Sequence, residues 1–188
     1  MTQTTNTTAA IIIIGAEVLS GKVNDENGPF LLRALRERGI DVKEIRIIDD
    51  DRKTIATALR ELANQVTFVF TTGGIGPTHD DITLESVAEA FNCALVRNQE
   101  LATRFKERVR DPKRQIAALR MADVPEGSTV TMVEFAPVIQ KENVTILPGV
   151  PILMRNCFAA IASEFHGAPF FSDAIFLKTS ESAIATHL

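Results

Sequence analysis

Short apolar runs alternate with segments of helical periodicity along most of the chain. Residues 11–14 are four consecutive isoleucines, and 66–70 form a second run rich in valine and phenylalanine. Unbroken β-branched runs are typical of strands buried on both faces of a parallel sheet. Elsewhere apolar residues recur every three or four positions, as at Ile55, Leu59 and Leu62, which predicts amphipathic helices. The alternation of the two patterns predicts an α/β fold.

The predicted elements follow one another as strand, then helix, which favours a mostly parallel sheet covered by helices on both faces in three α/β/α layers. Two strands flank a longer connection, and they predict an antiparallel edge. Strands are predicted at 11–14, 40–48, 66–70, 129–133, 143–147 and 171–177, and 92–96 is predicted to be a short strand or an extended connector. Helices are predicted from Pro29 to Gly39, after Asp51, at 84–91, 101–110, 115–121 and 152–162, and from Ser180 onward.

The two ends of the chain have their own expected roles. Residues 1–10 lack the basic start and long apolar centre of a signal peptide, so they are predicted to be a flexible leader. Residues 11–188 are predicted to form a single domain. The chain stops within the predicted helix at Ser180, so a C-terminal truncation is one interpretation of its end.

Composition narrows the classes of partner. The formal net charge is −4 over 188 residues with no lysine and arginine cluster, which argues against nucleic acid as a partner. No apolar run has the length of a membrane span, so no membrane is expected. The two cysteines, Cys93 and Cys157, lack metal-ligand spacing and are interpreted as small buried side chains in a reducing, cytoplasmic setting.

The segment 71–83, with the sequence TTGGIGPTHDDIT, lies between a predicted strand and a predicted helix. In open α/β sheets, ligands bind at the carboxyl ends of strands, where such turns lie. Glycine lets the backbone approach a ligand, and a helix N-terminus favours an anion such as phosphate. The residues predicted to bind ligand or phosphate here are Thr72, Gly73, Gly74, Gly76, Pro77 and Thr78.

Two carboxylates in the same segment change the nature of this site. Asp80 and Asp81 would repel a bare phosphate, and a divalent cation that bridges carboxylates to phosphate removes this conflict. We therefore predict a site for phosphate together with Mg²⁺ or another divalent cation.

Polar or glycine residues also follow other predicted strands, and in a parallel sheet these turns lie on the same rim. Each has a simpler explanation: a solvated acid for Glu17, a charged loop for 49–51, helix caps for Asp25 and Asn27, and a proline-ordered turn for 148–150. The convergence of four such turns favours a ligand site. It adds the candidate binding residues Gly15, Glu17, Asp25, Asn27, Pro148 and Gly149.

These motifs carry a family resemblance. The segment 73–83 resembles the signature of the molybdopterin-binding fold shared by MogA, MoaB and the gephyrin G domain. Several other segments make the chain similar to the N-terminal domain of competence/damage-inducible CinA-like proteins and to the related domain of eukaryotic FAD synthases. These are GAEVLSG at 15–21, DEN at 25–27, RMADVPEG at 120–127 and LPGVP at 147–151. The similarity covers about residues 11–187.

The resemblance implies a cytoplasmic homo-oligomer of three-layer domains that bind a phosphorylated pterin or a dinucleotide. In CinA-like proteins the pocket is associated with hydrolysis of pyrophosphate bonds of the ADP-ribose or FAD class. In MogA-like enzymes two aspartates serve magnesium-dependent adenylyl transfer, and Asp50 and Asp81 occupy the matching positions. The chain is therefore expected to be a metal-dependent nucleotide pyrophosphatase with Asp50 and Asp81 as catalytic residues. Its expected metal ligands are Asp50, Asp80 and Asp81.

Two alternatives remain open. One is a non-catalytic module that binds molybdopterin or a nucleotide without turnover. The other is a MogA-like molybdopterin adenylyltransferase of molybdenum cofactor biosynthesis. All three functions require the same glycines, and the sequence does not choose among molybdopterin, FAD and ADP-ribose as the ligand.

Overall fold

A six-stranded sheet forms the centre of the computed structural model, which describes residues 6–171, 176 and 178. The strand order is β2-β1-β3-β8-β7-β6, and the first four strands are parallel, whereas β7 is antiparallel to both of its neighbours. The predicted mostly parallel sheet with an antiparallel edge is therefore confirmed. The strand bounds are Thr8–Ile14 for β1, Asp41–Ile48 for β2, Phe68–Thr72 for β3, Thr129–Val133 for β6, Ala136–Lys141 for β7 and Val144–Leu147 for β8.

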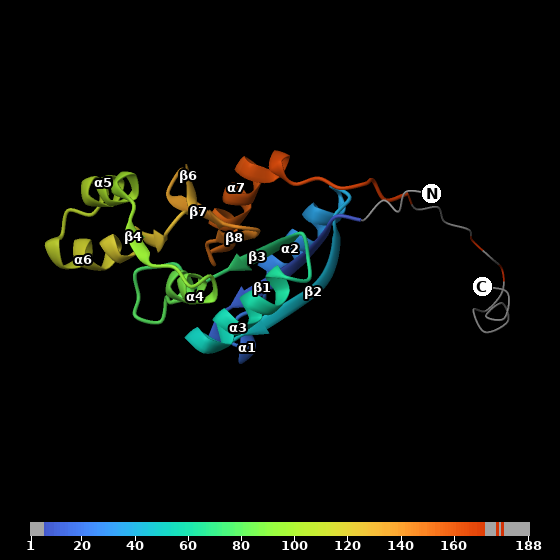
Figure 1. The fold of residues 1–188 in the computed structure, drawn as a ribbon, viewed down its shortest axis with the longest axis horizontal. Helices are drawn as coiled ribbons and strands as arrows, with labels where there is room; N and C mark the ends of the chain where they lie inside the picture. Colours follow the sequence, from blue (N-terminus) through green and yellow to red (C-terminus); the bar gives the residue numbers. More distant parts are fainter. Residues whose placement is uncertain (1–5, 172–175, 177, 179–188) are drawn as a thin grey trace.

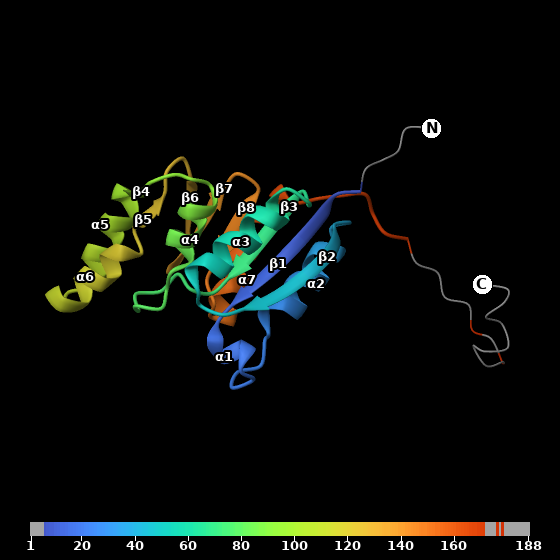
Figure 2. The same ribbon diagram turned by 60° about the horizontal axis from the view of Figure 1, so that its bottom comes forward.

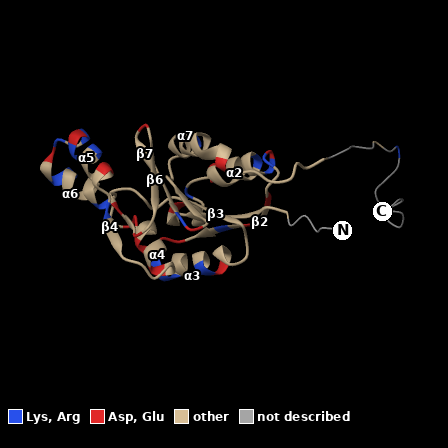
Figure 3. Ribbon diagram, turned by 45° about the horizontal axis from the view of Figure 1, so that its top comes forward, with Lys and Arg blue, Asp and Glu red and all other residues tan. Residues whose placement is uncertain are grey.

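Helices cover both faces of this sheet in three layers, with α2 and α7 on one side and α3 and α4 on the other (Figure 3). Each layer buries its own apolar cluster against the sheet, and both clusters draw on the central strand β1. The helix bounds are Asn27–Arg36 for α2, Arg52–Ala63 for α3, Thr83–Ala90 for α4 and Pro151–Ile161 for α7, which continues into a 3-10 turn at Ala162–Glu164.

Strand β1 supplies alternate side chains to the two cores. Ile12 and Ile14 face α3 and α4, whereas Ile11 and Ile13 face α2 and α7, and all four are almost fully buried. Burial of each isoleucine side chain contributes roughly 1.5–3 kcal/mol, so this strand anchors both layers. β1 is paired on both sides, by β2 and β3, so its carboxyl end, where residue 15 follows, lies inside the sheet and not at its edge.

The boundary of the predicted leader needs correction. Residues 8–10 belong to β1, and Ala9 and Ala10 are completely buried, so the flexible segment predicted for 1–10 extends too far. Parallel pairing with both β2 and β3 recruits these small residues. Alanine and threonine carry too weak a strand signal to reveal this from the sequence.

Three further elements differ from the prediction. β3 ends two residues later than the predicted strand, so Thr71 and Thr72 are buried strand residues. The expected connection between β6 and β8 contains a strand of its own, β7. A one-turn helix, α1 at Ala16–Leu19, follows β1 where a loop was expected. The predicted strand at 171–177 and the helix from Ser180 lie largely or wholly outside the described residues.

A helical arm projects from one end of the molecule, next to β6 and away from the long strands β1 and β2 (Figures 1 and 2). It contains α5 at Gln99–Arg108 and α6 at Pro112–Arg120. Strands β4 at Leu95–Arg97 and β5 at Asp123–Pro125 form a two-stranded antiparallel sheet at its base, and the Arg97–Asp123 ion pair joins them. The break predicted at 111–112 separates the two helices.

Within the described part of the chain, no helix combines the length and apolarity needed to cross a membrane.

The two cysteines differ in environment, and this gives a testable difference in reactivity. Cys157 on α7 is buried, and this burial, together with the nearby Glu134 carboxylate, raises the pKa of its thiol to about 11. Cys93 is only half-buried, in the turn after α4. Because the thiolate is the reactive form, we expect Cys93 to react with a disulfide reagent at pH 8 at least about 100-fold faster than Cys157. A Cys93→Ser variant should lose the fast phase, and a fast phase that persists would contradict this assignment.

Candidate functional site

The carboxyl ends of the parallel strands surround a cleft of about 560 Å³. This volume lies within the range of ligand pockets, roughly 300–1,000 Å³. The structure brings all of the residues predicted for the site to the lining of this one cleft. They are Gly15, Glu17, Asp25, Asn27, Asp50, Thr72, Gly73, Gly74, Gly76, Pro77, Thr78, Asp80, Asp81, Pro148 and Gly149.

The floor of the cleft is made of closely packed backbone. Gly73 and Gly74 have φ angles of +100° and +65°, which L-residues with side chains rarely adopt. A β-carbon on Gly73 would lie 2.1 Å from the carbonyl oxygen of Ile14, and one on Gly149 would lie 3.1 Å from the α-carbon of Gly73. Three strand ends therefore meet backbone against backbone, and glycine is required for this contact.

Thr83 fixes the glycine turn to the start of α4. Its hydroxyl donates to the Gly73 carbonyl at 2.9 Å, and its backbone N–H donates to the Gly74 carbonyl at 3.0 Å. No side chain caps the N-terminus of α4. The turn is thus held by the helix that follows it, and the positive end of the helix dipole faces this region.

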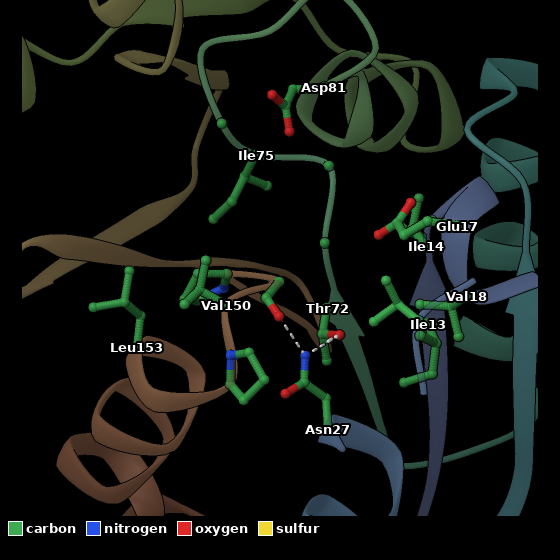
Figure 4. Close-up of a pocket in the computed structure, with 18 of the residues that line it drawn as sticks. Ile13, Ile14, Glu17, Val18, Asn27, Thr72, Ile75, Asp81, Val150 and Leu153 are labelled. Atoms are coloured by element: carbon green, nitrogen blue, oxygen red, sulfur yellow. Dashed lines mark hydrogen bonds between the residues drawn. The ribbon is translucent and has the colours of Figure 1, made fainter. Parts of the chain in front are cut away.

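Asn27 joins three loops at the bottom of the cleft. Its Nδ2 donates to Thr72 Oγ1 at 3.1 Å and to the Gly149 carbonyl oxygen at 2.7 Å, as the dashed lines in Figure 4 show. The residue is 5% exposed, and its Oδ1 has no hydrogen-bond partner among the described residues. An unpaired buried acceptor is costly, so a ligand that offers an N–H or O–H group here would remove that cost.

Asp25 caps the start of α2, which is one of the two roles that the sequence predicts for it. Its Oδ1 accepts from the backbone N–H groups of Asn27 at 2.9 Å and Gly28 at 3.0 Å, at the start of α2. It also lines the cleft. Asp51 caps α3 by accepting from the backbone N–H of Thr54 at 2.8 Å, and it is absent from the lining.

The charged side chains that line the cleft are acidic. Among the residues that the structure describes, six carboxylates line it, and no lysine, arginine or histidine does. Glu26 is the exception in having a cationic partner, because Arg155 of α7 lies 2.8 Å from its carboxylate. The cleft thus combines backbone suited to an anion with side chains suited to a cation. The six carboxylates are Glu17, Asp25, Glu26, Asp50, Asp80 and Asp81.

Asp50 lies at the end of β2, and its Oδ2 accepts from the backbone N–H of Ala16 at 2.8 Å. Burial raises the pKa of its carboxyl, the Ala16 hydrogen bond opposes that shift, and the negative charges of Glu17, Asp80 and Asp49 raise the pKa further. A carboxylate in such surroundings gains most from a bound cation.

Asp81 is held within its own turn. Its Oδ2 accepts from the backbone N–H of Thr78 at 2.8 Å and from the Thr78 hydroxyl. Among the described residues, no group of three or more Asp, Glu, His or Cys side chains is arranged to hold a metal ion. The predicted metal ligands Asp50, Asp80 and Asp81 share the cleft but are not pre-assembled, because Ala16 and Thr78 hold two of them. His79 is exposed and lies outside the lining.

The sequence does not predict that the β6–β7 hairpin and the helical arm form one wall of the cleft. Phe135, Ala136 and Pro137 come from the hairpin, and Met121 follows α6. The sequence predicts a connection where β7 lies. It therefore gives no reason to expect the residues next to β7 close to the glycine turn. In the structure, Phe135 is exposed and follows Glu134, which has a positive φ, and neither property can be predicted from the sequence.

Comparison with known proteins gives consistent matches. A family profile described as a probable molybdopterin binding domain matches residues 10–167. A protein of Archaeoglobus fulgidus is 35% identical over 180 residues, which cover 95% of this chain and 77% of the relative. A CinA-like protein of Flavobacterium psychrophilum is 38% identical, covering 78% of this chain and 37% of the relative. A probable FAD synthase of Caenorhabditis briggsae is 30% identical, covering 93% of this chain and 38% of the relative.

Solved structures agree with these matches. The structure of the protein CinA, of unknown function, from Thermoplasma acidophilum has a TM-score of 0.79 and 26% identity, covering 84% of this chain and 97% of the other. The tungsten cofactor synthesizing protein MoaB from Pyrococcus furiosus has a TM-score of 0.55 and 22% identity, covering 85% and 92%, and this likeness concerns the fold alone. The chain spans less than two fifths of the length of the Flavobacterium psychrophilum and Caenorhabditis briggsae relatives.

Proposed function

We infer that the cleft binds a phosphorylated pterin or a dinucleotide, because the chain belongs to the family of probable molybdopterin binding domains. One observation carries the proposal: the described part of the chain places six carboxylates and no basic side chain in the lining around a glycine turn at a helix start. The turn suits phosphate, and the carboxylates would repel it. A phosphorylated ligand that enters with a divalent cation satisfies both.

The donor set fits Mg²⁺ or a similar cation in one particular way. Mg²⁺ is usually held by one or two carboxylates together with substrate phosphates and water, rather than by a complete cage of protein ligands. Asp50 and Asp80 are the candidates, since the charge of Asp80 contributes to the raised pKa of Asp50. Asp81 supports the turn through Thr78.

We further propose that the protein hydrolyses a pyrophosphate bond of the ADP-ribose or FAD class. Backbone N–H groups of the turn after Gly73 would bind the phosphates, because the Gly73 N–H itself donates to the Leu147 carbonyl at 3.3 Å. Asn27 Oδ1 would accept an N–H or O–H group of the ligand. The bound cation would neutralise phosphate charge and acidify a water molecule. Asp50 would orient that water for attack on phosphorus, the bridging P–O bond would break, and two monophosphates would leave.

The test is a binding and product assay with ADP-ribose, FAD and ATP, each with Mg²⁺ and with EDTA. We expect Mg²⁺ to tighten binding at least about tenfold, because it removes the repulsion between carboxylates and phosphate. AMP formed from ADP-ribose supports the hydrolase. Binding without turnover identifies the non-catalytic module. Adenylylated molybdopterin made from ATP identifies the adenylyltransferase, and no binding of any of these ligands or of molybdopterin contradicts the proposal.

A further inference from the structure

A second cavity, of about 680 Å³, adjoins the cleft on the side of the helical arm. Pro77, Met121 and Phe135 line both spaces, so one ligand can extend from the first into the second. The remaining walls come from α5, α6 and the loop between them. A mononucleotide bound at the glycine turn would leave this space empty, whereas a dinucleotide has a second half to place there.

The charge of the second cavity is opposite to that of the cleft. Arg108, Arg110 and Arg114 line it together with a single acid, Asp111. Asp111 caps α6 by accepting from the backbone N–H of Lys113, and its other oxygen lies 3.9 Å from Arg114. Within the described residues, Arg108 and Arg110 form no ion pair, and lysines and arginines recur along α5 and α6 (blue in Figure 3). Arginine guanidinium groups bind phosphate well, so a cavity lined by three of them favours a phosphate group.

A stacked pair stands between the two cavities. The guanidinium of Arg108 lies 4.0 Å from the ring centroid of Phe135, whose side chain is 58% exposed. Phe135 is at the turn of the β6–β7 hairpin, directly after Glu134, whose φ of +49° lies in the left-handed region. Exposed aromatic rings and arginine planes are the surfaces on which nucleic-acid bases stack.

We propose that the second cavity binds the distal nucleoside of a dinucleotide, with its base against Phe135 and Arg108, and that the arginines bind an additional phosphate on that nucleoside. The inference deepens the proposed function and rests on it: the cleft takes the pyrophosphate with its cation, and the basic cavity selects among dinucleotides. The preferred ligands are then dinucleotides whose adenosine carries a ribose phosphate.

The test compares ADP-ribose with ADP-ribose 2′-phosphate, which differ by that one phosphate. Dissociation constants are measured by calorimetry with Ca²⁺ as the cation, to slow turnover. We expect the wild-type protein to bind the 2′-phosphate form at least about tenfold more tightly, since a charge-assisted arginine contact is lost without it. Arg108→Ala and Arg114→Ala should each reduce this ratio, and Arg104→Ala is the matched control because Arg104 also lies on α5 but pairs with Glu100.

A second variant separates stacking from charge. Phe135→Leu keeps an apolar side chain and removes the ring, so it should weaken both ligands by a similar factor and leave their ratio unchanged. A wild-type ratio near one overturns this inference and leaves the proposed function intact, provided that ADP-ribose binds. A ratio that Arg104→Ala lowers as much as Arg108→Ala also overturns it. If neither ligand binds, this inference fails, and binding of FAD, ATP or molybdopterin then decides the proposed function separately.

Discussion

Gly73→Ala is expected to destabilise the protein by about 3 kcal/mol or more, because it combines backbone strain with a steric clash. Gly73 has a φ of +100°, and a β-carbon there would lie 2.1 Å from the carbonyl oxygen of Ile14. Both partners are backbone at the centre of the sheet, so neither moves without disturbing β1 or β3. Urea unfolding of the wild type and the variant measures the difference.

Gly21→Ala is the matched control. Gly21 also has a positive φ, +74°, but a β-carbon there would have no heavy atom within 4 Å. Its substitution should cost only about 1 kcal/mol, the usual penalty for a side chain in the left-handed region. Equal losses in the two variants would show that conformation alone, and not close packing beneath the cleft, requires glycine at position 73.

Gly73→Ala also bears on function. The Gly73 carbonyl accepts from the Thr83 hydroxyl, so a displaced turn would release the start of α4. The loss of stability and the loss of phosphate binding should therefore occur together. Thr83→Val separates them: it removes the hydroxyl, keeps the backbone conformation and should weaken binding more than it lowers stability.

Local signals explain why the sequence located the cleft. The isoleucine run, the glycine turn and the capped helices each depend on residues close together in the chain, and a parallel sheet brings successive strand ends to one rim. That rule was sufficient to place Asp50 and Gly149 in the same cleft as the glycine turn. The sequence also predicts which positions of the turn need glycine, because a tight strand-to-helix turn limits which residues fit.

The features of the site that the sequence does not predict depend on long-range contacts. Asn27 bonds Thr72 and Gly149, which lie 45 and 122 positions away, and no local pattern reveals such a link. The pairing of β7 between β6 and β8 brings Phe135 to the cleft, although Ala136–Lys141 has no clear alternation of apolar and polar residues. The orientation of carboxylates is equally hidden: Asp81 faces Thr78 through contacts formed only once the turn has folded.

Asp50→Asn is expected to lower hydrolysis of ADP-ribose by about 100-fold or more, which is the usual effect of removing a charged group that acts at the reacting centre. Asparagine keeps the shape and can still accept from the Ala16 N–H, so folding should be retained. It removes the charge that would hold the cation. Product formation at saturating Mg²⁺ measures the effect, and turnover within twofold of wild type would exclude Asp50 from the reaction.

The same variant should be more stable than the wild type, although it is less active. The folded-state pKa of Asp50 is raised, chiefly by burial, so its contribution to stability is present at low pH and is lost as the pH rises through that pKa. Asp50→Asn should therefore gain stability relative to wild type between about pH 4 and pH 7. A carboxylate kept at a cost in stability is consistent with a functional role.

The adjacent residue supplies the control with the opposite sign. The Thr54 hydroxyl and backbone N–H lower the pKa of Asp51, so its contribution is present at neutral pH and is lost as the pH falls through its folded-state pKa. Asp51→Asn should lose stability relative to wild type as the pH rises toward about 4, the ordinary pKa of an aspartate, and the difference should stay constant above it. It should leave turnover unchanged, because Asp51 caps α3 outside the cleft. Urea unfolding of both variants below and above about pH 4 measures the two slopes. Slopes of the same sign would show that the two neighbouring carboxylates do not occupy the opposed environments on which the assignment of Asp50 to the cleft depends.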